Sequence, residues 1–354
     1  MKKIFVLIIF IIGIAACENQ PWSFPDYDKQ TVYFPIQLPI RTLSLGEDRI
    51  DNSLDKEFQF DIAVSIGGLF ENKKDWTVDY KVEDTLTNNV FIYDSKQDYT
   101  PDEKILNLPK SYYTLNPLNT VIIPSGSFNG RIRVQLTSAF FDDTIATTGR
   151  YVIPLRITGT SADSILTGKV SSGSAGDPRV TGDWESNASP KDWVMYGIKF
   201  VNAYHGTYLH RGRDLMTTTA TGLPYDTVIF RAKYVEKDVL IKMTTVGRKK
   251  VISNGAGNKI NPNRAMLLSF ENDLGTPGNI TITSAPTANV VITGTGHYQD
   301  IATSVEKWTG LTWQSMYLSY SYDDGTYTHQ IKDTLVFRDR GIKFQSNTIV
   351  VQPK

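Results

Sequence analysis

The residues best suited to chemistry lie in the run Tyr204-His205-Gly206-Thr207-Tyr208-Leu209-His210-Arg211. Aromatic rings pack against the C–H faces of sugars, and imidazole and guanidinium groups form hydrogen bonds with their hydroxyls. If the run is a strand, its side chains alternate between two faces. Tyr204, Tyr208 and His210 then share one face, and His205, Leu209 and Arg211 share the other. The same pattern is typical of a strand whose tyrosines are half-buried in a core, so both interpretations stay open.

Tryptophans in the second half of the chain are the other aromatic candidates. Trp308 and Trp313 flank Gly310 in a segment that resembles a loop entering a strand. An exposed indole there would form a stacking platform, whereas a buried one would close the end of a barrel. Trp193, at the start of a predicted strand, is a weaker candidate. The predicted carbohydrate-binding set is Trp308, Trp313, Trp193, Tyr204, His205, Tyr208, His210 and Arg211.

The sequence offers no catalytic constellation. The carboxylate pairs Asp142-Asp143 and Asp323-Asp324 lie in predicted turns, where adjacent side chains point apart, and glycoside hydrolysis needs two carboxylates at a fixed separation. A Gly-x-Ser-x-Gly elbow, a phosphate-binding loop and a His-Glu-x-x-His run are all missing from the sequence. We therefore expect no catalytic residue, no metal ligand and no cofactor, with calcium in a loop left open.

The first seventeen residues predict export. Lys2 and Lys3 precede an apolar run that is shorter than the roughly 20 residues of a membrane-spanning helix. Ile14-Ala15-Ala16-Cys17 resembles a bacterial lipobox, and Cys17 is the sole cysteine of the chain. We expect residues 1–16 to be a lipoprotein signal peptide, Cys17 to be the lipid anchor and residues 17–30 to be a tether. An ordinary signal peptide followed by a chance cysteine is the alternative.

Charge and composition exclude some partners. The chain has 37 Lys and Arg against 37 Asp and Glu, a balance without the basic excess that nucleic-acid binding requires. Without a second cysteine, the chain cannot form an internal disulfide, so its folds must depend on hydrophobic burial.

Period-two alternation in short segments predicts an all-β protein. Phe60, Ile62 and Val64 alternate with smaller or polar residues, as expected of strands with one buried face. Residues 31–167 predict an immunoglobulin-like β-sandwich, and the Gly- and Ser-rich stretch 168–190 predicts a linker. Residues 191–354 predict an antiparallel meander that closes into a lipocalin-like (calycin-like) β-barrel, with a second sandwich as the alternative.

Several segments support a family resemblance. Residues 120–126, 131–136 and 151–157 resemble the N-terminal immunoglobulin-like domain of Bacteroidetes-type surface lipoproteins from polysaccharide-utilisation (Sus-like) systems. Residues 196–212 and 333–341 are similar to the start and end of an uncharacterised C-terminal domain in those proteins. The resemblance implies an outer-membrane lipoprotein beside a SusC/SusD-like importer, binding extracellular glycan. It carries over no functional residue.

The sequence leaves two placements open for the protein, the cell surface and the periplasmic face of the outer membrane. The family's surface export favours several acidic residues just after the cysteine, and here only Glu18 is acidic before Asp26. We expect display at the cell surface, with the periplasmic face as the alternative. For function we expect non-catalytic glycan binding. The alternatives are a structural or adhesive protein that contacts other proteins and an uncatalogued glycoside hydrolase.

Overall fold

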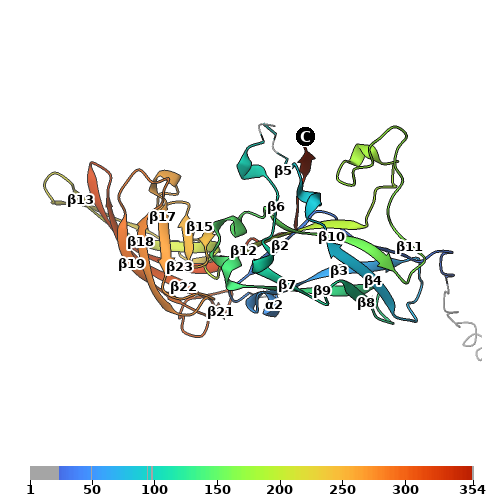
Figure 1. Cartoon of the computed structure of the whole chain (residues 1–354). Helices are drawn as coiled ribbons and strands as arrows, with labels where there is room; N and C mark the ends of the chain where they lie inside the picture. Colours follow the sequence, from blue (N-terminus) through green and yellow to red (C-terminus); the bar gives the residue numbers. More distant parts are fainter. Residues whose placement is uncertain (1–23, 49, 94, 97–98, 353–354) are drawn as a thin grey trace, which may run out of the picture.

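The protein folds into a β-sandwich and a β-barrel placed end to end (Figure 1). The computed structural model describes residues 24–352 except 49, 94, 97 and 98, so Cys17 and the predicted signal peptide lie outside the described residues. The predicted all-β class is confirmed. The few helices that the structure describes are too short or too polar to span a membrane.

The sandwich is formed by two main sheets. The strand order of the first sheet is β11 (Ser164–Ile165), β1 (Thr31–Tyr33), β3 (Gln59–Gly67), β9 (Asn129–Leu136) and β7 (Tyr113–Asn116). The second runs β24 (Gln345–Ser346), β2 (Pro39–Ser44), β12 (Trp193–Val201), β10 (Tyr151–Thr160), β4 (Trp76–Val82) and β8 (Thr120–Ile123), with β6 (Leu106–Asn107) beside β10. A two-stranded ribbon pairs β25 (Ile349–Val351) with β5 (Val90–Ile92).

Short helical segments connect these strands. Two are α-helical, α2 (Ser53–Lys56) and α3 (Ser138–Asp142). The 3₁₀ turns are η1 (Asp84–Thr87), η2 (Pro101–Glu103), η3 (Lys110–Tyr112), η4 (Thr144–Thr147), η5 (Thr181–Asp183), η6 (Val235–Lys237) and η7 (Pro262–Arg264).

The alternation predicted for the sandwich strands is present in its core. On β3, Phe60, Ile62 and Val64 are buried between the sheets, while Asp61 and Ala63 face outward. Such burial of aliphatic and aromatic side chains supplies the main driving force for folding. Hydrophobic burial must stabilise the sandwich, because a chain with one cysteine cannot form an internal disulfide.

The predicted domain boundary at residues 168–190 is wrong. Strand β12 follows this stretch, yet its residues Trp193–Ile198 pair with Arg156–Tyr151 of β10 and its residues Gly197–Val201 pair with β2. The chain also returns to the sandwich after the barrel, through β24 and β25. The sandwich therefore includes residues up to Val201 and again from about 345, and the barrel lies between them.

Residues 168–190 form an ordered loop on the sandwich. Arg179 is paired with Asp177 and donates a hydrogen bond of 2.7 Å to the carbonyl of Asn88, and the indole of Trp184 donates to the carbonyl of Asp177 at 2.8 Å. The Gly- and Ser-rich composition predicted a flexible linker, because a hydrogen bond between residues 91 positions apart, such as that from Arg179 to Asn88, leaves no pattern in the local sequence.

The barrel confirms the predicted meander and excludes a second sandwich. Its eight strands, in order around the ring, are β13 (Gly206–Thr218), β15 (Val239–Gly247), β16 (Lys250–Ser253), β17 (Met266–Phe270), β18 (Gly278–Ser284), β19 (Thr293–Gln299), β22 (Ser315–Asp323) and β23 (Tyr327–Asp339). Pairing of β23 with β13 closes the ring. Closure removes the exposed edges that an open meander would leave.

One strand lies outside the ring. The C-terminal half of β13 (Gly212–Thr217) pairs with β14 (Pro224–Phe230). The N-terminal half of β13 (Gly206–His210) pairs with β15 along the same edge. The β13–β14 hairpin therefore bends away from the barrel and extends beyond its rim (Figure 1). The small hairpin of β20 (Lys307–Trp308) and β21 (Leu311–Thr312) turns through Thr309 and Gly310, both at positive φ.

Candidate functional site

The interior of the barrel is packed with side chains, and this places three predicted sugar contacts in the core. Tyr204, Tyr208 and His210 are each 1% exposed. Tyr204 stacks on Phe270 with ring centroids 3.5 Å apart, and the hydroxyl of Tyr208 donates to the carbonyl of Tyr204 at 2.9 Å. A ring enclosed in this way cannot stack on a sugar. The prediction that these residues bind carbohydrate is wrong, and the core interpretation of the strand is right.

Several buried polar groups inside the barrel pair with one another, although Nδ1 of His210 and one carboxylate oxygen each of Asp214 and Asp333 have no hydrogen-bond partner among the described residues. Nε2 of His210 lies 3.0 Å from Asp333, and Nδ1 of His329 lies 2.6 Å from Asp214. The hydroxyl of Tyr320 donates to Asp333 at 2.6 Å, and burial raises the pKa of this phenol well above its usual value, so the donor stays protonated. These pairs compensate for desolvation of the carboxylates and have no solvent access for chemistry.

The tryptophan predictions mostly fail for the same reason. Trp193 is 3% exposed and Trp313 is 4% exposed, so both are core residues. Trp308 is half-buried: it stacks on Trp313 with centroids 4.9 Å apart, and its indole donates to the carbonyl of Phe337 at 3.0 Å. Only the outer face of Trp308 remains as a possible platform, and its role stays a prediction.

The last two predicted residues lie at partly buried positions. Nδ1 of His205 accepts a hydrogen bond of 3.1 Å from the backbone N–H of Thr245, so His205 joins the start of β13 to β15. Arg211 is on the outside of the barrel, where its Nε donates to the carboxylate of Asp238 at 2.6 Å. Of the eight predicted residues, Arg211 is the one beside the surface hollows described next.

The register of the barrel strands brings a different set of side chains together on its outer face. Arg213 of β13 is directly opposite Lys332 of β23, which is opposite Ser319 of β22. One step toward the rim, a second cross-strand row is formed by Thr227, Leu215, Gln330, Ser321 and Thr293, on strands β14, β13, β23, β22 and β19. Residues directly opposite in a sheet have Cβ atoms roughly 5 Å apart, so each row is continuous.

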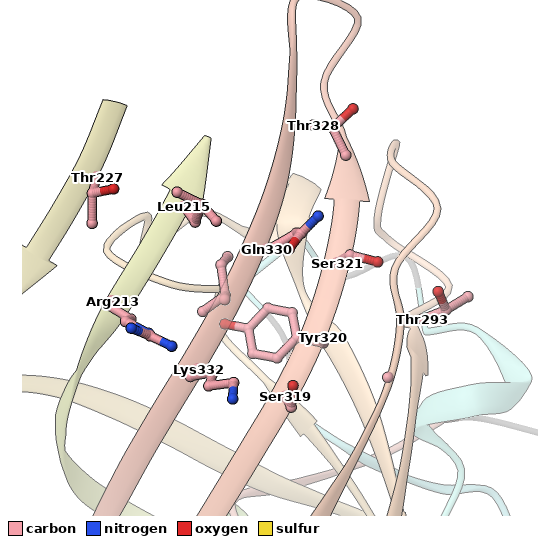
Figure 2. A pocket seen from close by; sticks show the side chains of 12 residues that line it. Arg213, Leu215, Thr227, Thr293, Ser319, Tyr320, Ser321, Thr328, Gln330 and Lys332 are labelled. Atoms are coloured by element: carbon pink, nitrogen blue, oxygen red, sulfur yellow. The ribbon is translucent and has the colours of Figure 1, made fainter. Parts of the chain in front are cut away.

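These rows line a hollow that we call the outer groove, with a volume of about 510 Å³. Figure 2 shows Arg213, Lys332, Ser319, Gln330, Ser321 and Thr293 along one face of the strands, with Leu215, Thr227 and Thr328 toward the rim. Thr227 of β14 and Leu215 of β13 both line the hollow, so the β13–β14 hairpin forms part of its wall. The described residues that line the groove include no Asp or Glu.

The side chains that line the outer groove suit a polar, hydroxylated ligand. Hydroxyls and an amide can both donate and accept hydrogen bonds, whereas guanidinium and ammonium groups only donate. Of the two aliphatic side chains in this set, Leu215 is 40% exposed and Ile331 is buried. Among the described residues, no group of three or more His, Cys, Asp or Glu side chains is placed to hold a metal ion.

Two glycines of β19 allow the sheet to curve beneath the groove. Gly294 and Gly296 face the barrel interior opposite Tyr320 and Leu318. A Cβ on Gly294 would lie 2.3 Å from the Cβ of Tyr320, closer than van der Waals contact permits. Absence of these side chains lets β19 approach β22 closely, which fixes the position of Ser319 and Ser321 on the outside.

The outer groove was not predicted from the sequence, although part of the signal is present there. In the segment 318–322, leucine or tyrosine alternates with serine, and the Asp-Gly turn after it fixes the hairpin register. From these two facts, Ser319 and Ser321 could have been placed opposite Lys332 and Gln330. The pairing of β13 with both β14 and β23 has no comparable local signal.

Acid should destabilise the protein through His205. Burial, with Arg340 and Lys199 nearby, lowers the pKa of His205 from 6.5 to about 4. Between these pH values the unfolded chain binds the proton more readily, so the stabilisation is complete above about pH 6.5 and is lost as pH falls. We expect a loss on the order of 1–3 kcal/mol between pH 7 and pH 4. Urea titrations of wild type and His205→Gln across this range test it, because glutamine can accept the same hydrogen bond without titrating. Parallel pH profiles for the two proteins would contradict the assignment.

Comparisons with known proteins agree with the revised boundary. A family model described as a domain of unknown function (DUF5627) matches residues 203–341, which begin directly after β12, and a model described as an N-terminal domain matches residues 27–164. A search of curated proteins returns no match.

Solved structures supply the relatives. A Bacteroides ovatus protein of unknown function, determined by structural genomics, is 31% identical, with 93% of this chain and 100% of that chain covered and a TM-score of 0.78. A second B. ovatus protein of unknown function is 16% identical over 89% of this chain and 97% of that chain, with a TM-score of 0.42. A B. ovatus multidomain protein that includes DUF1735 is 13% identical over 87% and 94%, with a TM-score of 0.40. At 31% identity over the full length of the first of these proteins, this chain belongs to the same family as that B. ovatus protein of unknown function.

Proposed function

We propose that the protein is a non-catalytic glycan-binding protein of the bacterial cell envelope and that the outer groove receives the sugar. The observation that carries this proposal is the cross-strand arrangement of the groove, which presents Ser319, Ser321, Gln330 and Thr293 side by side. Sugar hydroxyls need such mixed donors and acceptors. An elongated surface crossing five strands suits a stretch of polysaccharide better than a small enclosed ligand.

The cellular setting belongs to the same proposal. The lipobox-like sequence before Cys17 supports lipid anchoring, and the proposal places the anchor in the outer membrane with the folded domains outside the cell. The resemblance to Sus-like lipoproteins supports a SusC/SusD-like importer as the neighbouring complex. Weak binding at one groove would be sufficient there, because many anchored copies on one polymer act with avidity.

A double variant of the groove tests the proposal. Gln330→Ala with Ser321→Ala removes two hydrogen-bonding side chains that are directly opposite one another on β23 and β22. Each hydrogen bond contributes roughly 0.5–1.5 kcal/mol, so we expect the dissociation constant for the bound polysaccharide to rise about tenfold. Isothermal titration of the wild type and the variant against neutral and acidic polysaccharides measures this.

The matched control is Lys250→Ala with Ser269→Ala. These residues are also directly opposite one another, on β16 and β17, which lie across the ring from β22 and β23. The control should bind as the wild type does. Equal weakening by both double variants, or binding to none of the polysaccharides, would rule out the outer groove as a glycan site.

A protein partner is the second candidate function, and β14 favours it. This strand pairs only with β13 among the described residues, so its other edge is open. Leu223, Tyr225 and Ile229 along the hairpin are 63%, 58% and 64% exposed. An open edge with apolar side chains is a common site of strand addition by another protein. Loss of partner capture in Leu223→Lys, with polysaccharide binding unchanged, would support this candidate, because Leu223 lines neither the outer groove nor the hollow beside it.

A further inference from the structure

Four basic side chains gather at one end of the outer groove. Arg211, Arg213, Arg231 and Lys332 surround a second hollow of about 310 Å³ on the outside of β13 and β23. Arg213 and Lys332 also line the outer groove, so the two hollows form one continuous surface. We call these four residues the basic cluster.

Most of the basic cluster has no acidic partner. Arg211 is paired with Asp238. Within the described part of the chain, no carboxylate lies within ion-pair distance of Arg213, Arg231 or Lys332, and all three are exposed. The remaining arginines of the barrel do have carboxylates nearby: Arg248, Arg264, Arg338 and Arg340. The unpaired arginines are therefore concentrated at the groove.

The register makes this arrangement unfavourable without a ligand. Arg213 of β13 is directly opposite Lys332 of β23, and like charges at directly opposed positions destabilise a sheet. Lys332 is in turn opposite Ser319, which carries no charge to offset it. The chain as a whole has equal numbers of basic and acidic residues, so a general basic excess does not explain the cluster. An anion bound between the two side chains would convert their repulsion into attraction.

We propose that the ligand of the outer groove is an anionic glycan and that the basic cluster binds its carboxylate or sulfate groups. This inference rests on the proposed function and specifies its ligand class. Guanidinium groups bind carboxylate and sulfate-like anions through paired hydrogen bonds. The hydroxyl and amide row that continues from the cluster toward Thr293 would contact neighbouring uncharged positions of the same chain. That continuation, together with the neutral net charge, favours an acidic polysaccharide over a nucleic acid.

Pairs of polysaccharides that differ only in charge test the proposal. Dextran sulfate against dextran examines sulfate, and polygalacturonate against its methyl ester examines carboxylate. We expect the full chain to bind at least one anionic member about tenfold more tightly than its neutral partner at low salt. We also expect this preference to shrink as salt screens the charges.

Arg213→Gln with Lys332→Gln should abolish the preference for the anionic polymer while leaving the fold intact. Because the substitutions remove a like-charge pair, the free energy of unfolding should stay the same or rise, and urea titration checks this. Lys242→Gln with Lys250→Gln is the control, since it changes the net charge equally at two exposed positions on β15 and β16. The control should keep the preference.

The outcomes separate this inference from the function on which it rests. Equal binding of neutral and anionic partners, with weakening by the Gln330 and Ser321 variant, would overturn the anionic assignment and retain the glycan site. Equal loss in both glutamine double variants would show a non-specific charge effect and also overturn it. Tighter binding to duplex DNA than to every polysaccharide would overturn both proposals.

Discussion

Arg340→Ala is expected to lower the free energy of unfolding by about 3–5 kcal/mol. The Arg340 side chain is 2% exposed and reaches from the end of the barrel strand β23 to the segment after β2 of the sandwich. It donates hydrogen bonds to the carbonyls of Ala203 at 2.9 Å, His205 at 3.1 Å and Glu47 at 2.7 Å. Alanine would remove all three hydrogen bonds and would leave the buried carbonyl of Ala203 without this donor, and each unsatisfied buried group costs roughly 1–3 kcal/mol.

Chemical denaturation of Arg340→Ala beside Arg338→Ala measures this effect. Arg338 is exposed, and its Nε lies 3.6 Å from the carboxylate of the adjacent Asp339, so its removal should cost less than about 1 kcal/mol. Similar losses for both variants would show that Arg340 does not hold the junction. Arg340→Lys should be intermediate, because it keeps the charge but cannot reach several carbonyls at once.

Trp313→Ala is expected to be similarly destabilising, at about 3–5 kcal/mol. The indole is 4% exposed, stacks on Trp308 and donates to the carbonyl of Trp308 at 3.0 Å. Its removal would leave a large void in the barrel core beside Phe337. Thermal and urea unfolding of Trp313→Ala and Trp308→Ala should show a clearly smaller loss for Trp308, which is only half-buried.

The same variants decide whether this tryptophan pair has a role in binding. Trp313→Phe should recover much of the stability, because an aromatic ring still fills part of the space. A Trp313→Ala protein that unfolds like the wild type but loses polysaccharide binding would contradict the core assignment. It would also restore the stacking platform expected from the sequence.

Local patterns predicted the elements of this fold well. Alternation of Phe60, Ile62 and Val64 identifies β3, and the Asp-Gly turn at Gly325 identifies the β22–β23 hairpin. These features depend on neighbouring residues, so the sequence displays them directly. Barrel closure was also predicted, because a meander of eight to ten antiparallel strands leaves exposed edges unless it closes.

Long-range pairing is where prediction failed. Nothing local to Trp193–Val201 indicates that β12 pairs with β10 and β2 of the sandwich, and a Gly- and Ser-rich stretch just before it suggested a boundary instead. Prediction of the binding site failed for the same reason, because strand pairing decides which side chains face solvent. His210 and Tyr208 have the chemistry of sugar contacts, but parity along β13 places them inside a filled barrel.

Two observations define the candidate site: which strands pair in the barrel, and which basic side chains that pairing brings together. Arg213 and Lys332 are 119 positions apart in sequence and directly opposite in the sheet, so their shared surface is invisible until the barrel closes. Arg211 was chosen from the sequence because it ends the aromatic run 204–211. In the structure it lies beside the groove because it is on the outer face of β13, whereas the tyrosines of that run are buried.

The most direct test of the glycan site is a crystal structure of the protein with an oligosaccharide from its tightest-binding polysaccharide. The proposal predicts sugar density along the outer groove, with an acidic group between Arg213 and Lys332 and hydroxyls within hydrogen-bond distance of Gln330 and Ser321. Density confined to the sandwich, to the interior of the barrel or to the outer face of Trp308 would contradict it.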